Sequence, residues 1–258
     1  MQTTPSENEL KRLPQHWLTP DWPAPSNVRA YVTTRAGEFS LPPYEGLNFA
    51  KHVGDDAEAV EKNRQSLMQA FELKKTPQWI NQVHGIAVVE AADNKQVPDA
   101  DACFSRTTGQ ACTVLTADCL PVFFCDQAGT AVAVAHAGWK GLCDGMLEAT
   151  VAALVKTAAV PVQDLMAWIG PGIGPDSFEV GSEVREAFIA KDAKAAQAFT
   201  AKADKWLGDL YLIASQRLQN VGLTSIYGGG FDTFTDPRFY SFRRDNVTGR
   251  FLSIIWME

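Results

Sequence analysis

The chain has 258 residues, of which 46% are hydrophobic, and it carries a formal net charge of −7 at pH 7. This length and apolar content fit one large domain or two small ones and exclude a disordered or fibrous protein. The longest apolar runs are residues 131–135 and 151–155, which are far shorter than the roughly 20 residues of a membrane span. Because binding to nucleic acid requires a basic surface, the negative charge favours a small-molecule partner, with no nucleic acid and no membrane.

The first part of the chain predicts a lead-in, a strand and a helix. Residues 1–20 are polar and lack the apolar stretch of a signal peptide, so we expect a partly ordered lead-in and no export. Residues 27–34 are a predicted strand, and a loop rich in Gly and Pro follows. A helical pattern runs over residues 55–73, with Asp55 or Asp56 as its N-cap.

Five predicted strands follow, at residues 78–83, 86–90, 111–115, 120–125 and 130–135. The first two lie on either side of His84 and Gly85. The last two flank Asp126–Gly129, which has the Asp and Gly positions typical of a turn. These two strands therefore predict a β-hairpin.

The second half of the chain mixes helices and strands. Helices are predicted at about residues 141–157, from Ser182 onward, and at about 204–220, and strands at 165–170, 225–227, 239–243 and 251–256. No repeat, low-complexity tract or long linker marks a domain boundary. We predict an α+β fold, a single-domain layered sandwich of mixed β-sheets flanked by helices, over residues 1–258.

The predicted hairpin brings two metal-binding side chains together. With Asp126–Gly129 as the turn, Cys119 and His136 lie directly opposite each other, about 4.5–5.5 Å apart at Cβ, although a bulge at Gly129 would shift this register by one residue. His84 would supply a third ligand, which leaves a fourth position for water, as in a catalytic zinc site. In the alternative interpretation, Cys119 is a small buried apolar residue and the histidines bind loop backbone. The hairpin pairing favours the metal site.

The cysteines indicate the cellular compartment. Their number is odd and their spacing is unpaired, which fits the reducing cytoplasm better than a disulfide framework; they are Cys103, Cys112, Cys119, Cys125 and Cys143.

Several charged residues are further site candidates. Arg64 falls within the apolar stripe of its predicted helix, where a guanidinium needs either a substrate anion or an internal salt bridge. Glu179 and Asp118 are the candidate partners for such a salt bridge. Glu179 is a candidate general acid or base, and the alternative is a carboxylate at a helix N-terminus. Asp118, next to Cys119, is expected to point to the opposite face of its strand.

The C-terminal segment is rich in arginine in an otherwise acidic protein. A turn at residues 245–248 would place Arg243 opposite Arg250, where like charges are unfavourable without a counter-anion. Phosphate capture by these arginines, Arg243, Arg244 and Arg250, is one interpretation, and pairing of exposed arginines with surface carboxylates is the other.

Eight ordered motifs across nearly the whole chain resemble the laccase-domain family of purine nucleoside phosphorylases, also called multicopper polyphenol oxidases or peptidoglycan editing factors. The motifs are TTRAG, GLNFAKHVGDD, NR, NQVHG, TADCLPV, AHAGWKG, IGPGIGPDSFEVG and YSFRRDNVTGR. The resemblance implies zinc, with copper as the other candidate metal, bound by His84, Cys119 and His136. It implies substrate contacts at Asn48 and Arg64, and more weakly at Glu179.

The same resemblance implies phosphorolysis of adenosine, inosine, guanosine and methylthioadenosine, together with deamination of adenosine. Nucleoside and phosphate are then the expected partners, and the protein is expected to be a monomer or homodimer. One departure is Asp232, which stands where the family often has a cysteine. An accessory metal or redox role at that position is therefore not expected here.

Three rival functions fit the same residues. Copper-dependent oxidation of phenols normally requires several coppers and more histidines than the four present. A cysteine amide hydrolase of peptidoglycan-precursor editing would use Cys119 as nucleophile and His136 as base, and its activity would survive chelation but not thiol alkylation. A metal-stabilised interaction protein would use the arginine-rich C-terminal segment and would turn over no nucleoside.

Overall fold

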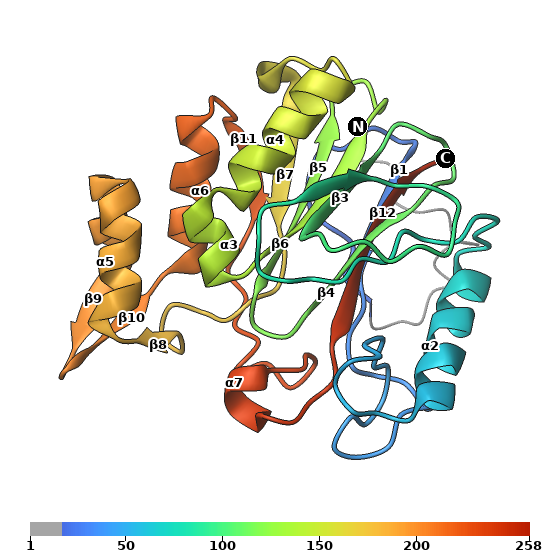
Figure 1. The fold of residues 1–258 in the computed structure, drawn as a ribbon, viewed down its shortest axis with the longest axis horizontal. Coiled ribbons are helices and arrows are strands. Elements are labelled where there is room, and N and C mark those ends of the chain that lie inside the picture. The colour runs from blue at the N-terminus through green and yellow to red at the C-terminus, as the bar shows by residue number, and fades with distance from the viewer. Residues whose placement is uncertain (1–16) are drawn as a thin grey trace.

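The structure is a computed structural model, and it describes residues 17–258. Its largest sheet has six strands in the order β11-β7-β5-β6-β3-β2 (Figure 1). The outer pairs β11 with β7 and β2 with β3 are parallel, and the inner pairs are antiparallel. The strands are β2 (Val88–Glu90), β3 (Ala102–Ser105), β5 (Leu120–Asp126), β6 (Val132–Ala137), β7 (Leu165–Ile169) and β11 (Ser225–Gly228).

A second sheet of three antiparallel strands has the order β1-β12-β4. It consists of β1 (Val28–Val32), β4 (Cys112–Thr116) and β12 (Phe251–Met257). Apolar side chains from both sheets form one buried cluster, which includes Val114 and Ile255 from the small sheet and Phe123 and Trp168 from the large one. The two sheets therefore pack face to face as a sandwich.

Helices cover the outer faces of both sheets. α2 (Ala57–Ala70) packs against the small sheet, where Leu67 joins a buried cluster with Ile254. The outer face of the large sheet carries α3 (Trp139–Asp144), α4 (Met146–Thr157) and α6 (Leu210–Asn220). Figure 1 shows α2 and this second group of helices on opposite sides of the sheets. The result is a four-layer sandwich, which confirms the predicted α+β fold class.

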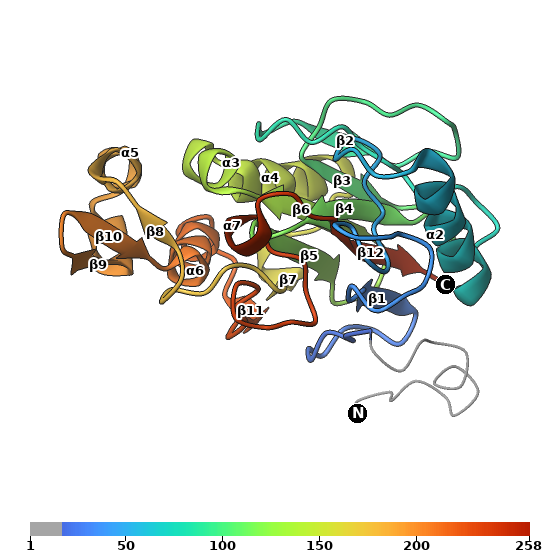
Figure 2. The ribbon, with the colours of Figure 1, turned by 90° about the horizontal axis from the view of Figure 1, so that it is seen from below.

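A small lobe extends from one end of the sandwich. It contains α5 (Ser182–Lys191) and the sheet β8-β10-β9, formed by β8 (Glu179–Val180), β10 (Lys205–Gly208) and β9 (Phe199–Lys202). Figure 2 shows it at the end of the molecule farthest from α2. Two short 3₁₀ turns, Val162–Asp164 and Ala193–Ala198, and α7 (Phe242–Asp245) complete the described elements. No helix within residues 17–258 has the length and hydrophobicity that crossing a bilayer requires.

Several sequence predictions are confirmed and others are wrong at identifiable residues. Asp56 caps α2 through its side chain, which accepts a hydrogen bond of 2.8 Å from the backbone N–H of Ala59. The single helix predicted at residues 141–157 is two helices, because Gly145 has a left-handed backbone with φ +108°. The helix predicted from residue 204 begins only at Leu210, because residues 205–208 form β10.

The prediction for the arginine-rich segment is also wrong. Residues 239–243 form no strand, and α7 begins at Phe242. The backbone N–H of Arg244 binds the side chain of Ser241, which caps this short helix. Because the predicted hairpin does not form, Arg243 does not lie opposite Arg250 across strands. Of the predicted lead-in, residues 1–16 lie outside the described part of the chain, and Leu18 forms a β-bridge with Val32.

Candidate metal centre

Three side chains from separate segments meet at one end of the large sheet. His84 lies in a loop, Cys119 immediately precedes β5, and His136 lies in β6. Their ligand atoms all lie within 4.8 Å of one another, and the Cys119 Sγ is 4.0 Å from the His84 Nε2. His136 is buried, Cys119 is half-buried and His84 is exposed, so the cluster opens to solvent on the His84 side.

The register of the hairpin differs from the predicted one. β5 and β6 pair Pro121 with His136, because the connection comprises the four residues between Asp126 and Ala131 rather than a tighter turn. The shift is two residues, so Cys119 lies diagonal to His136 instead of directly opposite. Because side chains on a strand alternate with a period of two, a shift of two keeps both side chains on the same face. The predicted pairing is therefore wrong, but the predicted proximity is confirmed.

Asp101 connects two of the three candidate ligands. One oxygen of its buried carboxylate lies 2.8 Å from the Nδ1 of His136. The carboxylate also accepts backbone hydrogen bonds from Val83 at 3.3 Å, His84 at 3.0 Å and Gly85 at 2.6 Å. Asp101 thus orients the His136 ring with its Nε2 free for a metal, and it holds the loop that carries His84.

Sequence reasoning missed Asp101 because it missed β3. This strand is only four residues long, Ala102–Ser105, and antiparallel pairing with β6 places Ala102 opposite Ala135. The same register puts Asp101 opposite His136, and the backbone N–H of His136 donates to the carbonyl of Asp101 at 2.7 Å. An aspartate immediately before an apolar segment was the available signal.

Backbone conformation at the centre is unusual at two positions. His84 has φ +60° and Asp118, next to Cys119, has φ +89°. Non-glycine residues rarely adopt such values, and strained residues of this kind concentrate at functional sites. The three hydrogen bonds that the Asp101 carboxylate accepts from backbone N–H groups hold the His84 loop in this conformation.

The charges of the centre oppose the effect of burial. Burial by itself raises the pKa of Cys119, but His136 and His84 outweigh it and lower this pKa to about 6. Burial by itself lowers the pKa of His136, but the Cys119 and Asp101 side chains outweigh it and raise this pKa to about 9. At neutral pH the metal-free centre is therefore a thiolate beside an imidazolium.

These residues fit one transition-metal ion. A thiolate and two imidazoles are ligands that zinc prefers, and copper accepts the same set. One imidazole is already oriented by a carboxylate, as is usual for metal-binding histidines. Within residues 17–258, this is the one group of His, Cys, Asp and Glu side chains close enough together to hold an ion.

The lowered pKa of Cys119 predicts its reactivity in metal-free protein. Because the thiolate is the reactive form, alkylation by iodoacetamide should reach half its maximal rate near pH 6, rather than near pH 8.5 as for an ordinary thiol. The rate should rise with pH through this value and be suppressed by added zinc. Peptide mapping of the labelled protein, with Cys119→Ser as control, measures the alkylation rate of Cys119 at each pH. A midpoint near pH 8.5 would show that the two histidines do not lower the pKa of Cys119.

Gly138 provides a second test of the geometry. A methyl group there would lie 2.7 Å from Cδ2 of His84 and 3.0 Å from Sγ of Cys119. We expect Gly138→Ala to displace both ligands and to weaken zinc binding by roughly 10–100-fold while the fold is retained. Circular dichroism and a zinc competition titration measure this, and unchanged zinc affinity would show that the ligands do not converge as described.

Arg64 lies on α2, and Asn48 lies in the loop before this helix. The Arg64 guanidinium stacks on the Trp79 ring at 3.7 Å and donates to the Phe49 carbonyl from Nε at 3.1 Å and Nη2 at 2.8 Å. It pairs with neither Glu179 nor Asp118, so the proposed internal salt bridge is wrong. Asn48 is fully buried, and its side chain binds Ala50, Asp55 and Arg250.

Glu179 lies in the lobe. Its carboxylate binds Lys205 at 2.8 Å and Lys202 at 3.2 Å. Hydrogen bonds from these lysines lower the pKa of Glu179, so the side chain is ionised at neutral pH and unsuited to act as a general acid. The second interpretation of Glu179, a carboxylate at the N-terminus of a helix, is also wrong, because Glu179 lies in β8.

Arg243 and Arg244 form mainly structural contacts. The Nη1 of Arg243 donates to the Glu179 carbonyl at 2.8 Å, and the backbone N–H of Arg243 binds the Asp118 carboxylate at 2.6 Å. Arg244 pairs with Asp245 at 2.8 Å and also binds three backbone carbonyls, those of Thr233, Phe234 and Phe239. Pairing with a surface carboxylate, the second interpretation of these arginines, therefore describes Arg244.

The two remaining aspartates tie loops together. Asp118 accepts a hydrogen bond from the Thr233 hydroxyl at 2.7 Å and so joins the Cys119 segment to the segment before α7. Asp232, at the position where the resemblance leads one to expect cysteine, accepts hydrogen bonds from the Gly174 N–H at 2.9 Å and the Ser177 hydroxyl at 2.6 Å. Asp232 therefore stabilises the loop after β7.

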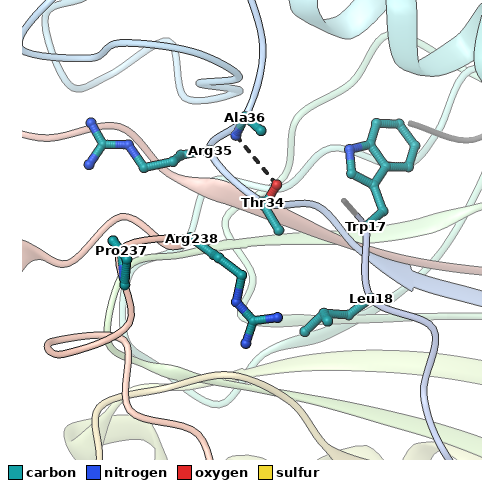
Figure 3. A pocket seen from close by; sticks show the side chains of 7 residues that line it. All are labelled: Trp17, Leu18, Thr34, Arg35, Ala36, Pro237 and Arg238. Atoms are coloured by element: carbon teal, nitrogen blue, oxygen red, sulfur yellow. Dashed lines mark hydrogen bonds between the residues drawn. The ribbon is translucent and has the colours of Figure 1, made fainter. Parts of the chain in front are cut away.

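A separate surface pocket contains none of the predicted site residues. It has a volume of about 400 Å³. Figure 3 shows the Arg35 side chain to the left of Thr34 and the Arg238 side chain below Thr34. The lining residues are Trp17, Leu18, Thr34, Arg35, Ala36, Pro237 and Arg238. The Arg238 guanidinium is already paired with Asp236 at 2.6 Å. The pocket shares no residue with the metal centre.

Comparison with known proteins identifies the family of the chain. Residues 29–258 match the family described as multi-copper polyphenol oxidoreductase laccase, and the chain belongs to this family. It is 53% identical over 245 residues to a purine nucleoside phosphorylase of Pseudomonas aeruginosa, covering 94% of this chain and 98% of that one. It is 50% identical over 242 residues to the purine nucleoside phosphorylase YfiH of Escherichia coli, covering 93% and 98%.

Solved structures show the same fold. A crystal structure of a Neisseria meningitidis protein matches with a TM-score of 0.89 at 46% identity, over 94% of this chain and 99% of that one. The crystal structure of YlmD from Geobacillus stearothermophilus matches with a TM-score of 0.87 at 26% identity, over 94% and 96%. The fold is therefore that of the family along nearly the whole chain.

Proposed function

We propose that this protein is a zinc-dependent purine nucleoside phosphorylase. The observation that carries the proposal is the convergence of His84, Cys119 and His136 on one solvent-accessible centre, in a chain whose relatives are named purine nucleoside phosphorylases. We propose adenosine, inosine, guanosine and methylthioadenosine as substrates, with orthophosphate as the second substrate. Deamination of adenosine at the same centre is part of the proposal.

The reaction determines what the site must do. An oxygen of phosphate bonds to C1′ of the sugar while the bond from C1′ to the base nitrogen breaks, and the base gains a proton. The products are the free purine and the 1-phosphate of the sugar. A zinc ion held by the three ligands would supply a Lewis acid for developing negative charge. Asp101 keeps His136 oriented through Nδ1, and the guanidinium of Arg64, which donates to the Phe49 carbonyl, would supply positive charge to the phosphate.

The remaining conditions follow from the side chains. All five cysteines are free thiols, and the Cys119 ligand must stay reduced, so we propose a reducing compartment, the cytoplasm, as the site of action. A monomer or homodimer acting on small molecules, without nucleic acid or membrane, agrees with the net charge of −7.

The test is a metal-quantified assay of base release from the four nucleosides with and without phosphate. The proposal expects free base and sugar 1-phosphate in equal amounts, and release that requires phosphate. The sugar product is ribose 1-phosphate from adenosine, inosine and guanosine, and 5-methylthioribose 1-phosphate from methylthioadenosine. For adenosine, ammonia release without phosphate tests the deaminase activity separately. If the zinc-loaded protein releases no base from any of the four nucleosides, the proposed function is wrong.

One observation favours a second candidate, a cysteine amide hydrolase. Asp101 orients His136, which lies beside the thiol of Cys119, and this is the order of groups that activates a cysteine nucleophile. This candidate predicts amide hydrolysis that persists after chelation and is lost on alkylation of Cys119. Activity that is lost on chelation and restored by zinc contradicts it.

A further inference from the structure

Arg64 and Arg250 lack a carboxylate partner within residues 17–258. Within residues 17–258, neither Arg64 nor Arg250 forms an ion pair, whereas five other arginines do: Arg29, Arg106, Arg217, Arg238 and Arg244. Both side chains are partly buried, and burial lowers the pKa of each guanidinium. Burying a guanidinium without a paired anion costs free energy, because the charge loses its hydration. This arrangement therefore favours binding of an anion from solution.

The backbone of Phe49 joins the two arginines. Its carbonyl accepts the two hydrogen bonds from Arg64, and its N–H donates to the carbonyl of Arg250 at 3.2 Å. The N–H of Arg250 in turn binds the buried side chain of Asn48 at 2.9 Å. The two arginines are therefore fixed on neighbouring segments, one on α2 and one just before β12.

Strand pairing places Arg250 next to the metal centre. β12 and β4 pair Phe251 with Thr116, so Arg250 lies at the level of Ala117, two residues before Cys119. The charges of Cys119 and Asp118 both act on the Arg250 guanidinium. Both oxygens of Asp118 already accept hydrogen bonds, from the Thr233 hydroxyl and from the N–H of Arg243.

His52 faces the same two arginines from the loop before α2. Burial, then the charges of Arg250 and Arg64, lower the pKa of its imidazole, so the ring is neutral at pH 7. The ring keeps an exposed face, and a hydrogen bond of 2.6 Å from the Tyr44 hydroxyl to the Val53 carbonyl fixes the adjacent backbone. A neutral imidazole still offers an N–H donor.

Among the contacts within residues 17–258, donors remain free on all three side chains. Arg64 uses Nε and Nη2 on Phe49, which leaves Nη1, and Arg250 uses Nη1 on the carbonyls of Thr248 and Gly249, which leaves Nε and Nη2. The carboxylate that acts on Arg64, that of Glu61, pairs with Lys51 at 2.9 Å. Two guanidinium groups and an imidazole N–H match the several acceptor oxygens of a tetrahedral oxyanion.

We propose that Arg64, Arg250 and His52 form a phosphate-binding site beside the metal centre. The proposal rests on the proposed phosphorolysis in one respect, that the phosphate bound there is the second substrate of the reaction. The site would then hold phosphate on the side of the centre formed by α2, with the nucleoside approaching the exposed His84. A phosphate ester, such as that of a nucleotide, offers the same chemistry.

The test is calorimetric titration of zinc-loaded, full-length protein with orthophosphate. Arg250→Met removes the free donors, and we expect the Kd for phosphate to rise roughly 10–100-fold without loss of zinc. Arg185→Met is the matched control, because Arg185 also has no ion pair within residues 17–258 and stacks on a tryptophan, Trp206, at 4.2 Å in the distant lobe. Its Kd should match that of the wild type.

Two further variants keep the test decisive. Arg250→Lys retains the positive charge but not the planar guanidinium, so its Kd for phosphate should lie between those of wild type and Arg250→Met. If Arg250→Met does not fold, Arg250→Lys takes its place in the test. His52→Gln should weaken phosphate binding by a smaller factor. If wild type binds no orthophosphate and no phosphate ester, or if every folded variant binds as wild type does, the site does not exist.

A second arm uses adenosine 5′-monophosphate to separate the two sources of phosphate. Loss of orthophosphate affinity in Arg250→Met, with a raised KM for phosphate and an unchanged KM for nucleoside, supports the second-substrate assignment. Loss of affinity for the nucleotide alone supports the site but assigns it to a phosphate ester. If phosphate binds as proposed while no nucleoside is cleaved, the phosphorylase proposal fails and the binding site stands.

Discussion

Replacing Asp101 with alanine is expected to lower the free energy of unfolding by about 3–5 kcal/mol, the usual cost of removing one partner from a buried charged network. The carboxylate accepts hydrogen bonds from three backbone N–H groups and lies 2.8 Å from Nδ1 of His136, all of which would be left unpaired. Zinc affinity should fall roughly 10–100-fold, because both histidines lose their orientation. Denaturant titration and chelator competition measure the two effects.

The matched control is Asp99→Ala, two residues away. Asp99 is exposed, and within the described residues 17–258 its carboxylate binds only the side chain of Asn81, at 2.7 Å. This change should alter the unfolding free energy by less than about 0.5 kcal/mol, as is usual for exposed positions. Equal effects of the two substitutions would contradict the role assigned to Asp101.

Replacing His84 with alanine should have the largest effect on turnover. We expect the protein to lose bound zinc and phosphate-dependent base release to fall by at least roughly 100-fold, because two ligands hold zinc far more weakly than three. The unfolding free energy of the metal-free form should change little, since the His84 side chain is exposed. Metal analysis, chemical denaturation and the base-release assay on the same preparation test this.

Cys143→Ala is the control for that experiment. Cys143 is a free, buried thiol on α3 whose side chain is not part of the ligand cluster. It should retain zinc and turnover. If His84→Ala retains both as well, His84 is not a ligand.

The sequence predicted the helices and strands that have a clear residue pattern within their own segment. α2 has a helical apolar stripe and an aspartate cap, and β5, β6 and β12 are continuous apolar segments, so their positions follow from the residues themselves. The failures involve elements with little local signal. The short strand β3 was missed, and β10 was read as the start of a helix, because pairing with distant segments determines both.

The same distinction applies to the site. Proximity of Cys119 and His136 was predictable because hairpin partners are close in sequence, and even a register error of two residues preserves the face. The positions of Asp101 and Arg250 depend on the pairing of β3 with β6 and of β12 with β4, which no local pattern specifies. Arg64 was singled out correctly as a residue on a buried helix face, but its partners, Trp79 and Phe49, were not.

The proposed function depends most directly on one metal ion that serves the phosphorylase reaction. The decisive measurement is phosphate-dependent base release as a function of zinc bound per chain, from metal-free protein to one equivalent added back. We predict no activity without metal, a linear rise, and a plateau at one zinc per chain that His84→Ala does not reach. Full activity in protein freed of metal, or a rise that continues with several coppers per chain, would contradict it.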